Sequence, residues 1–258
     1  MAYDEIIPCG KDTGAPRNLL KRLGLIQRYT DVQEITVLDC GCGTGQYMEA
    51  LLQLGANAYG VEYDGAKVAA FQNGHPRFAR RVQTGDIESM EFPDASFDLV
   101  LLNEVLEHVP NENQALQEIY RVLKPGGMLI IFAPNRMYPF ETHSVVVKYG
   151  NLRLPIYFPF IPYIPLWVGQ RIFRYIARNY WPYQLRQLVR ANGFTIVDTD
   201  YVWQTFENIS RTQPKVISLL RPILRRAFAL LERVPILKMF GISQVVIARK
   251  QPAAMKAD

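Results

Sequence analysis

Residues 36–45 constrain the fold of this chain more than any other stretch; they read Thr-Val-Leu-Asp-Cys-Gly-Cys-Gly-Thr-Gly. A short apolar run ends in Asp39, glycines follow at alternate positions (Gly41, Gly43 and Gly45), and an amphipathic helical pattern begins behind them. Glycines at this spacing let the backbone turn sharply off a strand and approach a ligand without an intervening Cβ. The stretch therefore predicts a strand, a tight ligand-binding turn and a helix.

The spacing of the glycines also narrows the class of ligand. It is G-x-G-x-G, whereas dinucleotide-binding turns use G-x-G-x-x-G, and the loop lacks the Lys-Ser/Thr pair with which a P-loop holds phosphates. A nucleoside ligand without a polyphosphate fits better. The loop therefore favours S-adenosylmethionine over NAD or ATP.

Apolar strand patterns alternate with helical patterns through the first half of the chain. The strand-like runs are Ile35–Cys40, Ala58–Glu62, Phe97–Asn103 and Met128–Ala133, and helical patterns lie near 45–54, 65–73 and 112–123. This alternation predicts an α/β fold, in which a parallel sheet carries helices on both faces. A ligand should bind at the carboxyl ends of the strands, at the switch point beside the first strand, where the glycine loop lies.

The pattern changes after Pro134. Residues 152–168 hold four prolines among aromatic and aliphatic residues, which excludes a long helix. Helical patterns return near 169–180 and 182–192, and strands are expected at Phe194–Trp203 and Ile242–Arg249. We expect one domain over 1–258, with a lid or substrate insertion at 134–181 and a basic amphipathic insertion at 204–240.

The charge of the chain is divided between its halves. Residues 1–141 carry 12 Lys/Arg and 19 Asp/Glu, a net charge of −7, whereas residues 142–258 carry 17 Lys/Arg and 5 Asp/Glu, a net charge of +12. Between Thr142 and Val197 there is no acidic residue. The two halves are therefore expected to face different surroundings.

The three cysteines (Cys9, Cys40 and Cys42) are too few for a disulfide framework, which suits a reducing cytoplasm. Two of them lie in the glycine loop, where packing of small residues is favoured over a metal or redox pair. The sequence shows no signal-like start and no apolar run long enough to span a bilayer. The expected location is cytoplasmic, with the inner face of a membrane as a peripheral site.

Five blocks in order resemble class I S-adenosylmethionine-dependent methyltransferases, in particular the group of ubiquinone-biosynthesis O-methyltransferases and type 11 methyltransferases. The resemblance is strong over roughly 35–135. The blocks are Val37–Gly45, Gly60–Asp64, Gly85–Ile87, Phe97–Val109 and Arg121–Leu129. The resemblance implies S-adenosylmethionine as cofactor and a Rossmann-like, doubly wound sheet of seven mostly parallel strands, the last of them antiparallel.

The resemblance also assigns a cofactor site. Glu62 would hold the two ribose hydroxyls, since a carboxylate offers two acceptor oxygens to two adjacent donors. Asp86 would accept from the exocyclic amine of adenine. Asp39 either contacts the cofactor or orients the glycine loop. The full expected set is Asp39, Gly41, Cys42, Gly43, Gly45, Glu62, Tyr63, Asp86, Ile87 and Asn103.

Candidates for the chemistry follow the fourth and fifth strands. Methyl transfer is an in-line displacement that needs alignment of the acceptor and removal of one proton. Glu104, Glu107 and His108 are spaced i, i+3 and i+4, so on a short helix they would share one face. His143 arrives after the fifth strand. We expect His143, His108 and Glu104 to be catalytic.

The same four residues, Glu104, Glu107, His108 and His143, are also a candidate metal site for a divalent ion such as Mg²⁺. They resemble the Glu-x-x-Glu-His of ubiquinone O-methyltransferases and the site of enzymes that methylate the 2′-hydroxyl of small RNAs. A metal there would lower the pKa of the acceptor hydroxyls. Since Leu-Glu-His-Val is widespread in class I methyltransferases that need no metal, a metal-free site stays open.

The acceptor must be selected by the insertions, because loops carry specificity on a shared fold. Apolar residues interleaved with arginines suit an anionic membrane surface and a lipophilic acceptor. The alternative is that these residues form lid and dimer core, with a soluble metabolite or sugar as acceptor. RNA and a non-catalytic cofactor-binding module are disfavoured, and an oligomer is open.

Overall fold

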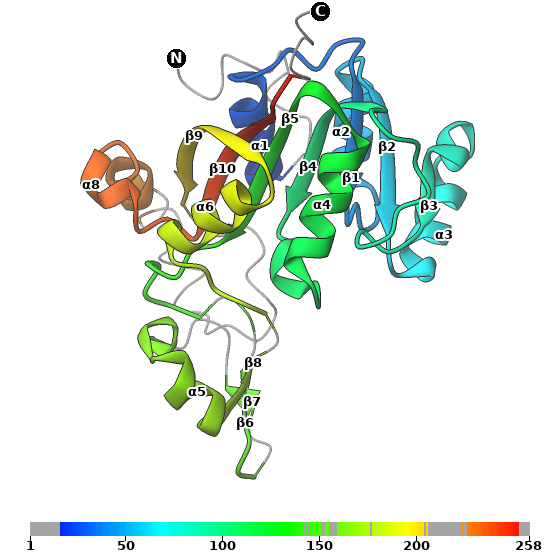
Figure 1. Cartoon of the computed structure of the whole chain (residues 1–258). Helices are drawn as coiled ribbons and strands as arrows, with labels where there is room; N and C mark the ends of the chain where they lie inside the picture. The colour runs from blue at the N-terminus through cyan, green and yellow to red at the C-terminus, as the bar shows by residue number, and fades with distance from the viewer. Residues whose placement is uncertain are drawn as a thin grey trace, which may run out of the picture.

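The computed structural model describes residues 16–141, 143, 145–150, 153–154, 159–175, 177–203, 205, 223 and 226–252. The strands of the main sheet are β1 (Thr36–Cys40), β2 (Asn57–Glu62), β3 (Val82–Thr84), β4 (Phe97–Asn103), β5 (Leu123–Pro134), β9 (Phe194–Val202) and β10 (Ser243–Lys250). The helices packed around it are α1 (Arg17–Gln27), α2 (Gln46–Gln53), α3 (Gly65–Gly74), α4 (Glu112–Val122) and α6 (Pro182–Ala191) (Figure 1).

The sheet has the order β3-β2-β1-β4-β5-β10-β9. β1 pairs in parallel with both β2 and β4, and β4 pairs in parallel with β5, whereas β10 runs antiparallel to β5 and β9. The predicted doubly wound, mostly parallel sheet of seven strands with an antiparallel last strand is confirmed. The order reverses between β1 and β4, so the glycine loop behind β1 lies at the switch point.

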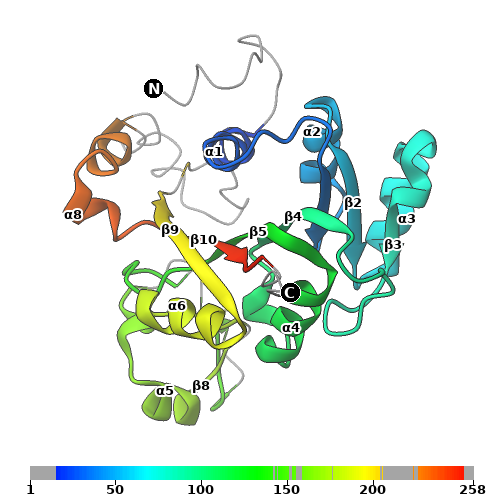
Figure 2. The same cartoon turned by 45° about the horizontal axis from the view of Figure 1, so that its top comes forward.

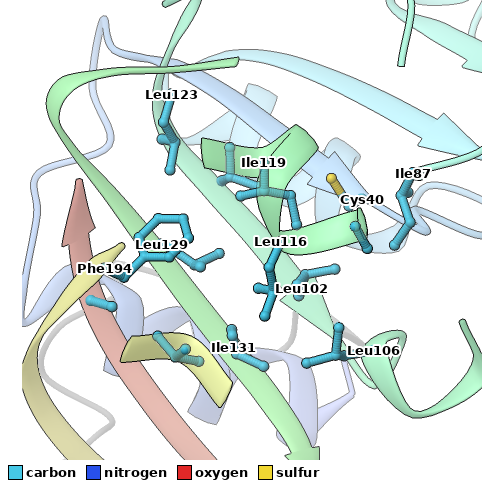
Figure 3. Close-up of a cluster of buried hydrophobic side chains, with 14 of the residues drawn as sticks. Cys40, Ile87, Leu102, Leu106, Leu116, Ile119, Leu123, Leu129, Ile131 and Phe194 are labelled. Carbon is cyan, nitrogen blue, oxygen red and sulfur yellow. The ribbon is translucent and has the colours of Figure 1, made fainter. Parts of the chain in front are cut away.

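Two apolar clusters cover the two faces of the sheet. One joins β4 and β5 to α4 and α6, and Figure 3 shows its Leu102, Leu116, Ile119 and Ile131 side chains meeting between strand and helix. The other includes residues of α1, α2 and α3. Because both faces are covered, the central strands are buried along nearly their whole length, as parallel sheets require. Cys40 and Cys42 are free, buried thiols.

Helices and strands differ from the sequence prediction in several places. α1 and β3 were not predicted, and β5 begins earlier than expected, since Pro125–Gly127 lies within it. The helix expected near 169–180 is wrong beyond Ile172, where α5 (Leu166–Ile172) gives way to β8 (Phe173–Tyr175). Phe173 and Tyr175 are an aromatic alternation that pairs with β6 (Val145–Val147), and this pairing overrides the helical pattern.

The insertion after β5 folds as a small separate layer. β6, β8 and β7 (Arg153–Leu154) form a three-stranded antiparallel sheet, and α5 lies beside it, away from the main sheet (Figure 1). The expected insertion at 204–240 is described in part: residues 226–231 are helical and α8 (Pro235–Lys238) follows. Residues 206–222, which include most of its Leu-, Ile- and Arg-rich stretch, lie outside the described residues. No described helix is both long enough and apolar enough to cross a membrane.

Candidate functional site

The glycine loop is packed too closely for side chains at two of its positions. Gly41 and Gly45 have positive φ angles of 71° and 88°. A Cβ at Gly41 would lie 2.4 Å from Cγ2 of Val105, and one at Gly45 would lie 2.1 Å from the ring of Phe71. Gly43, with φ 58°, differs because no described atom lies within 4 Å of its Cβ position. The loop is therefore held on two sides and open at Gly43.

Glu62 ends β2 and holds the loop in place. Its Oε2 accepts a hydrogen bond from the Gly43 amide at 2.9 Å, and its Oε1 accepts from the Asp64 amide at 3.1 Å. Lys67 Nζ lies 3.5 Å from Oε1. Two carboxylate oxygens offer about four acceptor positions, of which these donors occupy three. Glu62 therefore keeps capacity for one further donor next to the open side of the loop, and the long contact to Lys67 is the one that a second donor would replace.

Asp39 is the penultimate residue of β1 and is 2% exposed. Its Oδ2 has no hydrogen-bond partner among the described residues. Burial, and then the charge of Glu62, raise the pKa of Asp39 to about 7. A buried carboxylate oxygen without a donor is costly, so this position is suited to a ligand that brings a donor or a positive charge.

The other residues expected to bind the cofactor are in varied surroundings. Cys42 is buried, and burial raises the pKa of its thiol. Tyr63 is 79% exposed, so its ring is free to cover a ligand beside Glu62. Asp86 is exposed and accepts from the Glu88 amide at 2.9 Å, while Ile87 is buried beside it.

Asn103 leads to a residue that the sequence analysis missed. Its Oδ1 accepts a hydrogen bond from Nη1 of Arg22, which lies on α1 and is 4% exposed. Nη2 of Arg22 donates to Glu104 Oε1 at 2.7 Å and to Ser243 Oγ at 2.8 Å. The signal in the sequence was a single arginine on the apolar stripe of Leu19, Leu23 and Ile26, since a charge on such a stripe must find partners.

A second cluster of acid and imidazole groups forms behind β4. Nε2 of His108 lies 3.8 Å from Oε1 of Glu107, and Nε2 of His143 lies 4.0 Å from the same oxygen. The two imidazole rings are 5.2 Å apart, edge to face. These are the described side chains whose possible metal-ligand atoms all lie within 4.8 Å of one another.

Burial sets the protonation of this cluster. Glu107 is 2% exposed, and neither of its carboxylate oxygens has a hydrogen-bond partner among the described residues. Burial and the neighbouring Glu104 raise the pKa of Glu107 well above its usual range. Burial also lowers the pKa of His143, which keeps its imidazole neutral near pH 7. A neutral imidazole is able to accept a proton.

Glu104 does not take the place predicted for it. The shared helical face expected for Glu104, Glu107 and His108 is wrong, because Glu104 has a φ of 57° and precedes the short 3₁₀ helix η3 (Leu106–His108). Its Oε1 accepts from Arg22 and, at 2.5 Å, from the Ser243 hydroxyl. Glu104 is absent from the group of potential ligand atoms within 4.8 Å, so it lies beside this cluster as the partner of Arg22.

Residues of the lid insertion contact the Glu107–His108–His143 cluster. Glu141 Oε1 accepts from the His143 amide at 3.0 Å, and Glu141 Oε2 accepts from Asn179 Nδ2 at 3.0 Å. The Arg178 amide donates to the Glu107 carbonyl. Asn179 also lines a cavity of about 380 Å³ between α4, α6 and the lid, whose other walls include Ile161, Ala177, Tyr180 and Leu188.

Comparison with known proteins identifies the part of the chain that carries the glycine loop. Residues 38–131 match the family model described as a methyltransferase domain. The resemblance to class I methyltransferases is confirmed over this stretch. A probable S-adenosylmethionine-dependent methyltransferase of Mycolicibacterium smegmatis is 35% identical over 101 residues, which are 39% of this chain and 38% of the relative. A ubiquinone biosynthesis O-methyltransferase of Bradyrhizobium is 38% identical over 106 residues, 40% of this chain and 41% of the relative.

Solved structures extend the likeness to nearly the whole chain, at the level of the fold. An S-adenosylmethionine-dependent methyltransferase from Mesorhizobium loti superposes with a TM-score of 0.58 at 18% identity, covering 90% of this chain and 97% of the other. The [4+2]-cyclase SpnF superposes with a TM-score of 0.56 at 22% identity, covering 91% and 82%. The chain spans about two fifths of the length of the two sequence relatives named above.

Proposed function

We propose that this chain is an S-adenosylmethionine-dependent methyltransferase. The observation that carries the proposal is the buried Oδ2 of Asp39, which has no hydrogen-bond partner among the described residues and lies in the strand that leads into the glycine loop. S-adenosylmethionine carries an ammonium and a sulfonium cation, which suit this oxygen, and a ribose diol, which suits Glu62. The match of residues 38–131 to a methyltransferase domain supports the same conclusion.

Residues of three strand ends would hold the cofactor. Glu62 would accept from the ribose hydroxyls, Asp39 would face the cationic end, and Asp86 and Ile87 would contact the adenine. Tyr63 is exposed enough to close over the ribose. When bound, the cofactor supplies an electrophilic methyl group on sulfur.

The Glu107–His108–His143 cluster would manage the proton of an acceptor hydroxyl. His143 Nε2 would take the proton of the acceptor hydroxyl, which frees the acceptor oxygen to bond to the methyl group that a bound cofactor would supply. Burial lowers the pKa of His143, but the charge of Glu104 raises it and would stabilise the imidazolium that results. O-methylation therefore suits the cluster, because a hydroxyl needs a base where an amine needs less help.

A divalent metal is the second candidate for the same step. It would be held by Glu107, His108 and His143, which offer one carboxylate and two imidazoles within 4.8 Å, a donor set for a borderline or transition ion. The oxygens of Glu107, which have no hydrogen-bond partner in the described part of the chain, fit such an ion. A bound metal would lower the pKa of the acceptor hydroxyl.

The proposed acceptor is lipophilic and is reached at a membrane surface. The apolar lid beside the His143 cluster supports this, as does the similarity to proteins named ubiquinone biosynthesis O-methyltransferases. A soluble metabolite or sugar is the alternative, and RNA is a weaker one. Because a cyclase shares the fold, a test has to detect the transferred methyl group itself.

The test supplies methyl-labelled S-adenosylmethionine with separate lipid, polar-metabolite and RNA extracts. Label is expected in the lipid fraction. His143→Gln should lower kcat by about 100-fold with unchanged cofactor affinity, since general bases contribute about that factor. Label in no fraction despite cofactor binding would contradict methyl transfer. Full activity in chelator would exclude the metal, whereas loss that Mg²⁺ or Mn²⁺ restores would favour it over the metal-free base.

A further inference from the structure

Two exposed clusters combine large apolar side chains with arginines. The first, here called the α5 patch, comprises Phe160, Trp167, Arg171, Ile172 and Arg174 of the lid. Trp167 is 65% exposed and Phe160 is 64% exposed. The Arg171 guanidinium lies 5.8 Å from the centre of the Trp167 ring, so the cation and the indole are presented together.

The second cluster, here called the α8 patch, comprises Arg226, Leu230, Arg233, Val234 and Ile236. Ile236 is 72% exposed and Leu230 is 61% exposed. Single exposed apolar residues are ordinary, but groups of them with a basic rim mark a surface that meets a partner.

Both patches emerge from the edge of the sheet where the glycine loop lies. β5 leads into the lid and β9 leads into the second insertion. Because β5 and β9 each run antiparallel to β10, they are parallel to one another, and their carboxyl ends share one edge. β1 ends at that edge too, since it runs parallel to β4 and hence to β5. In Figures 1 and 2 both α5 and α8 lie on the side of the molecule away from α3.

The charges select the partner. No acidic residue occurs between Thr142 and Val197, a span that contains the whole α5 patch. A surface of Trp, Phe and Ile with arginines suits the interface of an anionic bilayer, where rings and aliphatic chains enter the head-group region and guanidiniums pair with lipid phosphates. The α5 patch offers no acid with which the basic residues of a protein partner could pair.

We propose that the α5 patch and the α8 patch dock this protein on an anionic bilayer, with the carboxyl edge of its sheet facing the lipid. The proposal rests on the proposed function in one respect, that the acceptor of the methyl group is taken from that bilayer. The docking itself needs no acceptor and is measured without turnover.

The test is flotation of the full chain with vesicles of phosphatidylcholine alone or mixed with phosphatidylglycerol. The wild type should float with the mixed vesicles at low salt and less at high salt. Trp167→Ser combined with Ile236→Ser, and separately Arg171→Glu combined with Arg174→Glu, should each reduce the bound fraction at least tenfold. The matched controls are Val197→Ser, an exposed apolar residue outside both patches, and Arg80→Glu on η2 (Pro76–Arg81), which precedes β3 at the far edge of the sheet. Both should float like the wild type.

Three results would overturn the docking: no flotation of the wild type with anionic vesicles, equal binding to both vesicle types, or equal loss in patch and control variants. A dimer that Trp167→Ser dissociates, without flotation, would assign the patches to a second copy instead. Calorimetry of S-adenosylmethionine binding on the same variants separates the two proposals. A variant that no longer floats but still binds the cofactor bears on the docking proposal alone. A wild type that does not bind the cofactor contradicts the proposed methyltransferase function.

Discussion

Two carboxylates at neighbouring strand ends differ in their surroundings and hence in what they can do. Glu62 accepts hydrogen bonds from two backbone amides, whereas Asp39 is buried with one oxygen that no described residue contacts by a hydrogen bond. Burial and the Glu62 charge raise the pKa of Asp39 to about 7, against an ordinary value of 3.8. The charged form of Asp39 therefore destabilises the fold until a cation offsets it.

This pKa gives the protein a dependence on pH that Asp39→Asn should remove. The native state keeps a proton on Asp39 that the unfolded chain releases between about pH 4 and pH 7, so stability falls as pH rises through that window. Relative to wild type, Asp39→Asn should be equally stable near pH 4 and more stable by up to about 4 kcal/mol near pH 8. Urea unfolding at both pH values measures this. An identical difference at both would contradict the ionisation of Asp39.

The ordered motifs in the sequence predicted where the site residues lie in their strands, but they did not predict which side chains contact one another. Asp39, Glu62 and Asn103 lie in the last two residues of neighbouring strands as expected, because strand ends follow from the apolar runs before them. The place of Glu104 was not predictable, since it depends on a left-handed backbone and on Arg22, which is 82 residues away in the chain. No local pattern encodes that contact.

Among the elements, α1 links the site to the second insertion. Arg22 contacts Asn103, Glu104 and Ser243, and on the same helix Lys21 donates to Glu232 Oε2 at 2.5 Å, next to the α8 patch. Burial lowers the pKa of Lys21, against the attraction of Glu232. One helix therefore contacts both the carboxyl ends of the strands and the segment proposed to meet lipid.

A double-mutant cycle tests the attachment of α1. Arg22→Met leaves the Glu104 carboxylate without its cation and should cost about 3 kcal/mol of unfolding free energy. Glu104→Gln combined with Arg22→Met should recover part of that loss, because no charge is then left unpaired. Chemical denaturation measures these two variants and Glu104→Gln alone, which completes the cycle. Strictly additive losses would mean that Arg22 and Glu104 are not coupled.

The sequence predicted the helices and strands that have a local pattern of apolar and turn residues, and it missed those that form by long-range pairing. β1, β2, β4 and α4 were placed within one or two residues, because long apolar periods and turn residues bound them. β8 and the three-stranded sheet of the lid were missed, because three-residue strands carry almost no periodicity and form only when distant segments pair. The amphipathic α1 was not predicted, because it begins without a side-chain N-cap and without an acidic residue in its first turn.

For the whole molecule, the division of charge in the sequence separates two regions of the structure. The acidic half, with a net charge of −7, contains β1 to β5 and the glycine loop, and the basic half, with +12, contains the α5 and α8 patches. The fold brings both halves to one edge of the sheet. The cationic cofactor is thus expected to face the acidic half, and the anionic surface is expected to face the basic half.

The most direct test of the central claim is calorimetric titration of the protein with S-adenosylmethionine. One equivalent should bind to the wild type, Glu62→Gln should weaken binding at least tenfold through loss of charge-assisted hydrogen bonds to the ribose, and the exposed Glu91→Gln should bind as the wild type does. Thermal melts of the three proteins check that each is folded. No binding by the folded wild type, or equal affinity in Glu62→Gln, would contradict the assignment of the site.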